Sequence, residues 1–383
     1  MERSIYYVSL VVLFAAAIVA AFRPVPYRVG HIALPGHVAL PGHVKLPAHI
    51  TLLSKGTAKP LAFAGPSFPP LSGATVWLNT QPLTPAGLRG KVVLVEFWTY
   101  TCINWRRTLP YVRAWAERYK DQGLVVIGVS TPEFSFEKDV DNVRRATKEM
   151  RMDFPVALDN DYAIWRAFGN QYWPALYFID AQGHIRHQHF GEGSYDESEK
   201  VIQQLLAEAG VKGLPAELTP VEPNGYELAA DGNTLMSGEN YLGYGRTEGF
   251  SSPGGLVYDR RHIYVTPARL ELNQWALSGD WTLGEEAAVV NKAGGRLIYR
   301  FHARDVNLIL GPAKPGTSVR FRVLIDGKAP DAAHGVDVDG QGGGVITDQR
   351  MYQLIRQHGP IIDREVTIEF PDAGAAAFDF TFG

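Results

Sequence analysis

The chain has 383 residues, of which 37 are Lys or Arg and 40 are Asp or Glu, so its formal net charge is -3 at pH 7. This balance provides no broad basic field for a phosphate backbone, and nucleic acid is not an expected partner. A single cysteine, Cys102, excludes an internal disulfide framework and any zinc site built on paired cysteines. The length predicts two domains.

The N-terminal segment is apolar. Residues 5–22 carry no charge and are followed by Arg23 and Arg28. The length of this run lies between that of a long apolar core of a signal peptide and that of a membrane-spanning helix, which needs about 20 residues. We therefore predict a signal peptide or membrane anchor over residues 1–22, and favour the anchor. The rest of the chain is then expected on the extracytoplasmic, periplasmic side, attached to the inner membrane or secreted after cleavage.

A short repeat follows the apolar segment. Histidines recur at every sixth position with prolines between them: His31, His37, His43 and His49 alternate with Pro35, Pro41 and Pro47. These prolines exclude a continuous helix. In a polyproline-like chain, neighbouring histidines would lie roughly 19 Å apart, too far to share a metal ion. We predict a semi-rigid spacer over residues 23–64.

The central region alternates strand and helix patterns. The apolar run 92–98 predicts a buried strand, and residues 104–119 have helical spacing. Further strands are predicted at 124–130, 175–180 and 184–190, and further helices at 136–150, 162–170 and 196–209. This order predicts a mixed α/β domain over residues 65–212. Cys102 falls between the first strand and its helix, where free amide groups and the helix dipole stabilise a thiolate.

The segment around the cysteine resembles a known active site. The stretch Phe97-Trp98-Thr99-Tyr100-Thr101-Cys102-Ile103-Asn104 is similar to that of extracytoplasmic thioredoxin-like proteins of the TlpA and ResA type, and especially to the soluble region of DipZ-type thiol-disulfide interchange proteins. The resemblance implies a thioredoxin-like fold. It also implies that Glu96 is the buried acid behind the thiols, and that Trp173 and Pro174 form the cis-proline loop facing Cys102.

One position departs from the family pattern. Where the family has Cys-x-x-Cys, this chain reads Cys102-Ile103-Asn104-Trp105. An indole cannot release a mixed disulfide, so the second step of exchange must come from another molecule. We predict monothiol exchange through Cys102 with protein thiols or disulfides. Glutathione or a separate membrane electron donor would complete the cycle, Glu96 would tune Cys102, and Pro174 would shape the groove. No cofactor or metal is expected.

Two alternatives stay open for Cys102. The pattern Thr99-x-x-Cys102 matches the core of single-cysteine peroxidases of the AhpC/TSA type, which oxidise a thiolate to sulfenic acid, although Val95 stands where they have proline. The other alternative is a degenerate domain that binds a partner without catalysis. Four aromatic side chains are predicted to form an apolar substrate groove beside the thiol, with core packing as the alternative: Trp98, Tyr100, Trp105 and Trp173.

The C-terminal region predicts an all-β domain. After a linker over residues 213–225, short alternating strands are predicted at 296–311, 318–327, 364–370 and 377–383. Residues 226–383 therefore predict a β-sandwich, jelly-roll-like. An aromatic and guanidinium set suggests a glycan site like that of carbohydrate-binding modules, with ordinary core packing as the alternative: Trp275, Trp281, Tyr299, Arg322 and Tyr352.

Overall fold

The computed structural model describes residues 65–383. The predicted signal or anchor segment and the predicted spacer lie outside the described residues. Within residues 65–383, no helix is both long enough and apolar enough to cross a membrane.

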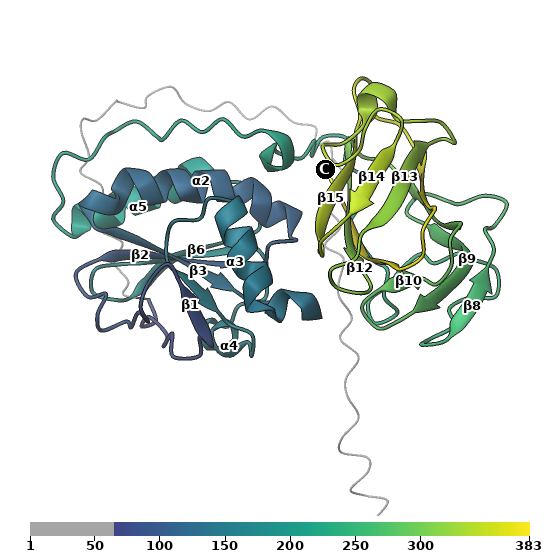
Figure 1. Ribbon diagram of the computed structural model, residues 1–383. Helices are drawn as coiled ribbons and strands as arrows, with labels where there is room; N and C mark the ends of the chain where they lie inside the picture. Colours follow the sequence, from purple (N-terminus) through teal and green to yellow (C-terminus); the bar gives the residue numbers. More distant parts are fainter. Residues whose placement is uncertain (1–64) are drawn as a thin grey trace, which may run out of the picture. The chain divides into compact units, whose positions relative to one another are not determined.

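The first part of the described chain is a six-stranded mixed sheet (Figure 1). The spatial order is β1-β4-β3-β2-β5-β6. Strands β2, β3 and β4 are parallel, whereas β1, β5 and β6 run antiparallel to their neighbours. This arrangement confirms the predicted thioredoxin-like α/β fold. The strands are β1 (Val76–Leu78), β2 (Val92–Trp98), β3 (Leu124–Ser130), β4 (Val156–Leu158), β5 (Ala175–Ile179) and β6 (Ile185–Phe190).

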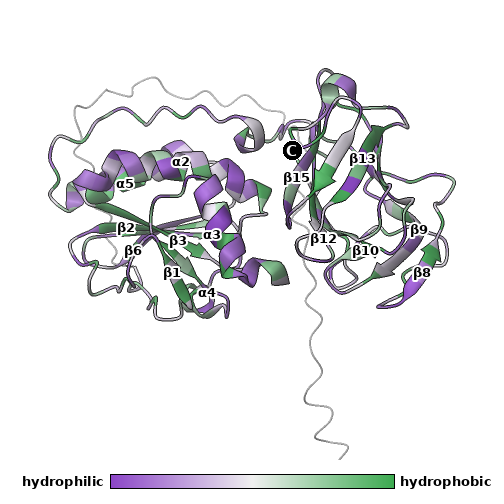
Figure 2. Cartoon of the chain, viewed as in Figure 1, coloured by the Kyte–Doolittle hydropathy of each residue, from purple (hydrophilic) through white to green (hydrophobic). Residues whose placement is uncertain are grey.

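Helices cover both faces of this sheet because β2 is apolar on both sides. Val92, Leu94 and Trp98 pack with α2, α3 and α5, whereas the alternate residues Val93 and Val95 pack on the face covered by α4. Figure 2 shows the apolar strand β2 and the hydrophilic outer sides of α2 and α5. The helices are α2 (Ile103–Tyr119), α3 (Val140–Glu149), α4 (Ala163–Phe168) and α5 (Tyr195–Glu208).

One predicted helix begins later than expected. The sequence predicts a helix from residue 136, but α3 starts at Val140. Asp139 is its N-cap, and the Asp139 side chain accepts hydrogen bonds from the backbone amides of Asp141 and Asn142. The preceding Ser135–Lys138 segment forms a 3₁₀ turn instead.

The second part of the described chain is all-β, as predicted, but it is one curled antiparallel sheet rather than a sandwich of two sheets. Strand β9 joins what would be the two layers: its residues 275–278 pair with β11, and its residues 281–283 pair with β10. Gly279 lies between these pairings with a φ of 95°, a left-handed conformation that glycine adopts without strain. The strand therefore bends at Gly279 and closes the sheet around one core.

The predicted strand over 296–311 is interrupted by a turn and forms two strands, β11 and β12. The strands of the all-β part are β7 (Asn240–Tyr241), β8 (Arg261–Tyr264), β9 (Trp275–Leu283), β10 (Ala288–Val290), β11 (Gly295–Phe301), β12 (Asp305–Pro312), β13 (Val319–Ile325), β14 (Gly343–Ile346), β15 (Arg350–Arg356), β16 (Arg364–Phe370) and β17 (Ala375–Phe382).

Candidate active site

Cys102 lies at the junction between β2 and α2, as predicted. It is the N-cap residue of α2, with an extended backbone, and it is half-buried. Its Sγ lies 3.8 Å from the backbone oxygen of Trp173. The peptide bond between Trp173 and Pro174 is cis. The fold therefore brings Cys102 and the predicted cis-proline loop together, although they are about 70 residues apart.

Glu96, the predicted buried acid in β2, is paired with Trp105. The Trp105 Nε1 donates a hydrogen bond of 2.8 Å to Glu96 Oε1, and both side chains are fully buried. The other oxygen, Oε2, has no hydrogen-bond partner among residues 65–383. Burial raises the pKa of Glu96 to about 8, against the lowering effects of Trp105 and Arg113. The indole of Trp105 is thus the hydrogen-bond partner of this buried acid.

The predicted aromatic groove is wrong for three of its four residues. Trp98 and Trp105 are completely buried and stack on each other with ring centroids 4.5 Å apart, and Tyr100 is 2% exposed. Even-numbered residues of β2 face α2, so Trp98 points into the core and not toward a partner. Trp173 alone is half-buried beside the thiol, where its Nε1 donates to the backbone oxygen of Thr131.

The electrostatic surroundings of Cys102 oppose the predicted stabilisation of a thiolate. Burial raises the pKa of the Cys102 thiol well above its usual value, and the carboxylates of Glu239 and Glu133 raise it further. The backbone amides of Trp105 and Asn104 lower it, as expected at a helix N-terminus, but they are the smaller effects. The balance of these effects therefore favours the protonated thiol.

Three acidic side chains form a cluster, and two of them, Glu133 and Glu239, are the carboxylates that act on the pKa of Cys102. Glu133 follows β3, Glu239 precedes β7, and Asp379 lies in β17. The Tyr241 hydroxyl contacts the carboxyl groups of Glu133 and Glu239, and Arg246 forms a 3.0 Å ion pair with Glu133. Asp379 is fully buried, and burial together with the charge of Glu239 raises its pKa. Sequence spacing gives no signal for this cluster, because its members are more than 100 residues apart.

The predicted glycan site is wrong for its aromatic residues. Trp275, Trp281, Tyr299 and Tyr352 are all 0% exposed and belong to the core of the curled sheet. A buried ring has no free face for a sugar, so the alternative of core packing holds. Arg322 alone is exposed, and its Nε donates to the backbone oxygen of Gln341.

Two family models match the chain. The AhpC/TSA family matches residues 67–188, and a family described as a thioredoxin-like C-terminal domain matches residues 237–383. The first match contains β2, Cys102 and the cis-proline loop, and the second contains the curled sheet from β7 onward.

The chain is also similar to known proteins and solved structures. Protein DipZ of Mycobacterium bovis is 41% identical over 258 residues, which are 66% of this chain and 36% of DipZ. The chain thus spans about a third of the length of the DipZ proteins that it matches. A solved thioredoxin-like protein in its oxidised form is 31% identical with a TM-score of 0.35, and the match covers 37% of this chain and 95% of that one.

The thiol-disulfide oxidoreductase YkuV of Bacillus subtilis is 31% identical over 140 residues, which are 37% of this chain and 94% of YkuV. The match therefore covers nearly the whole length of this relative. The chain belongs to the family of thioredoxin-like thiol-disulfide oxidoreductases.

Proposed function

We propose that this protein exchanges thiols and disulfides of other proteins through Cys102 alone, on the extracytoplasmic side of a membrane. The observation that carries the proposal is the pairing of Trp105 with Glu96, which puts an indole where the family pattern has its second thiol. The relatives named as thiol-disulfide oxidoreductases support the reaction class. The uncharged run of residues 5–22 supports the location.

The proposed cycle has two exchange steps and needs an external thiol. The Cys102 thiolate attacks one sulfur of a substrate disulfide, forming a mixed disulfide and releasing the other sulfur as a thiolate that takes up a proton. A second thiolate, from glutathione or a separate electron donor, then attacks the substrate sulfur of the mixed disulfide. This step returns Cys102 as a thiolate and leaves the external thiol joined to the substrate. A second external thiol reduces that product.

The identity of the thiol chemistry is tested by intact mass of the full chain after separate exposure to oxidised glutathione and to hydrogen peroxide. We expect a reducible glutathione adduct on the native chain and none on Cys102→Ser. A sulfenic or sulfinic mass gain at low peroxide, without the adduct, would contradict the proposal and favour the single-cysteine peroxidase. No modification by either reagent would favour a non-catalytic binding protein.

The acidic side chains near the thiol are expected to slow its reaction at neutral pH. Glu239→Gln removes one of the carboxylates that raise the pKa of Cys102. Burial raises the pKa of Glu239 itself to about 7, so its charge is present mainly above that pH. Lowering the pKa of Cys102 by one unit would raise the thiolate fraction about tenfold, so iodoacetamide should react about tenfold faster at pH 8. The measurement is the alkylation rate from pH 6 to 10. Glu369→Gln, in β16, controls for the loss of one negative charge, and an unchanged profile in Glu239→Gln would contradict the assignment.

A further inference from the structure

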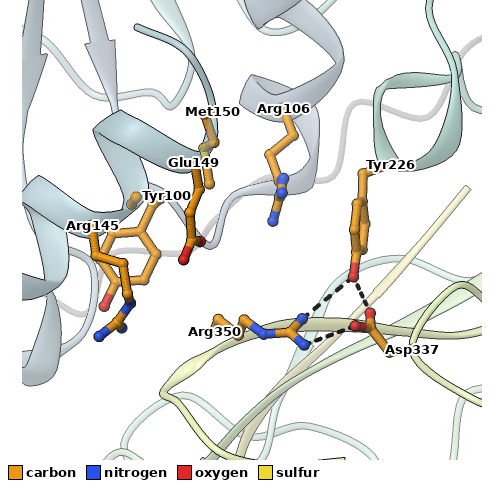
Figure 3. A pocket seen from close by; sticks show the side chains of 9 residues that line it. Tyr100, Arg106, Arg145, Glu149, Met150, Tyr226, Asp337 and Arg350 are labelled. Atoms are coloured by element: carbon orange, nitrogen blue, oxygen red, sulfur yellow. Dashed lines mark hydrogen bonds and ion pairs between the residues drawn. The ribbon is translucent and has the colours of Figure 1, made fainter.

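A cavity of about 350 Å³ lies beside the first turns of α2 and is separate from the cysteine itself (Figure 3). Its volume is at the lower end of the range for small-molecule sites. Two of its lining residues, Tyr100 and Arg106, lie on either side of Cys102 in the sequence. The opposite wall includes Tyr226, Asp337 and Arg350.

Arg106 is the cation of this cavity that lacks an anionic partner. Its guanidinium lies over the Tyr226 ring, 4.3 Å from the centroid, and it makes no ion pair or side-chain hydrogen bond with any residue between 65 and 383. The neighbouring Arg350 is satisfied, since Asp337 accepts a hydrogen bond of 2.8 Å from its Nη2. Figure 3 shows Arg350 joined to Asp337 and Tyr226, whereas no hydrogen bond or ion pair is drawn to Arg106. The carboxylates of Asp337 and Glu227 act on the charge of Arg106 from a distance, but neither is paired with it. An arginine stays charged in proteins, so a partly desolvated guanidinium without a paired carboxylate favours an anion.

Tyr100 supplies an independent sign of a ligand. The side chain is 2% exposed, and its hydroxyl has no hydrogen-bond partner within the described part of the chain. Leaving a buried hydroxyl unpaired costs free energy, and such groups in native proteins are normally satisfied by something. Tyr100 and Arg106 line one cavity, in which the Tyr100 hydroxyl is drawn on the side of Arg145 (Figure 3), and a hydroxyl and a guanidinium can both donate hydrogen bonds to an oxyanion.

We propose that this cavity binds a small oxyanion-bearing molecule, a carboxylate or a phosphate, with Arg106 as its charge partner and Tyr100 as a hydrogen-bond donor. The planar guanidinium fork matches both groups. The enclosed volume limits the ligand to the size of a small metabolite. Glu149 also lines the cavity and is exposed, so its carboxylate opposes an incoming anion. The site uses no atom of Cys102 and does not depend on the exchange reaction.

The test is isothermal titration calorimetry of the full chain with inorganic phosphate and, separately, with succinate. At least one probe should bind with a one-to-one stoichiometry. Binding of phosphate alone would support a phosphate ligand, and binding of succinate alone would support a carboxylate ligand. Binding should weaken at least tenfold in Arg106→Gln and several-fold in Tyr100→Phe, and it should tighten in Glu149→Gln.

Matched variants make the test specific. Arg296→Gln removes an exposed arginine from β11 and should leave binding unchanged, and so should Cys102→Ser. Binding of neither probe to the native chain would overturn the proposal, as would equal binding to Arg106→Gln. If Arg106→Gln fails to fold, the other two variants test the site: binding should weaken in Tyr100→Phe and tighten in Glu149→Gln. Anions that bind non-specifically to the surface would not respond to the loss of the Tyr100 hydroxyl.

Discussion

Replacing Trp105 with cysteine is expected to turn this monothiol protein into a dithiol reductase. The new thiol would stand three positions after Cys102, in the first turn of α2. It would lie on the side of Glu96, the carboxyl that is paired with Trp105 in the native chain and that could exchange a proton with the new thiol. An intramolecular thiol resolves a mixed disulfide far faster than one from solution, so reduction of insulin disulfides with dithiothreitol should rise about 100-fold or more.

The substitution also empties a large part of the core, which requires a matched control. Trp105 is completely buried, stacks on Trp98 and donates to Glu96. Its loss should lower the free energy of unfolding by about 3–5 kcal/mol. Trp105→Ala makes a similar cavity without a thiol, so the two variants should be similarly destabilised but differ in activity. Equal activity of the Cys and Ala variants would show that the groove beside Cys102 is unsuited to catalysis.

The elements nearest the cysteine were predictable because their signals are local. Strands β2 and β3 have the predicted bounds, since each is a mostly apolar run with polar residues or glycine at its ends. Because each of these strands is followed by a helical segment, the sequence predicts a mixed α/β domain with Cys102 at a strand-to-helix junction. The cis bond before Pro174 followed from the family resemblance and not from the pattern of residues.

The errors arise where tertiary burial overrides a local signal. Trp98 could have been assigned to the core, because it continues the alternation of Val92 and Leu94 on the face covered by α2. The reversal of the thiol pKa could not be predicted in this way. A helix N-terminus favours the Cys102 thiolate, but burial and the carboxylate of Glu239, which lies far along the chain, have the larger effect. Such contacts between distant segments leave no periodicity in the sequence.

Glu96→Gln is expected to stabilise the protein at alkaline pH. The Glu96 carboxyl is fully buried, and burial raises its pKa from 4.5 to about 8 in the folded chain. The folded state therefore binds this proton more tightly than the unfolded state does. The resulting stabilisation is complete below pH 4.5 and is lost as the pH rises from 4.5 to about 8. The loss is on the order of 5 kcal/mol, since each pKa unit corresponds to about 1.4 kcal/mol.

Glutamine has the shape of glutamic acid and cannot ionise, and its carbonyl oxygen can still accept the hydrogen bond from Trp105. Urea unfolding at pH 5 and pH 9 should therefore give nearly equal free energies for the two chains at pH 5 and a more stable variant at pH 9. Glu117→Gln, at an exposed position of α2, controls for the loss of one negative charge. A Glu96→Gln effect that does not grow with pH would mean that Glu96 is ionised in the folded protein. In that case the carboxylate beside Trp105 would be charged at neutral pH, and it could accept a proton in the Trp105→Cys variant without first losing its own.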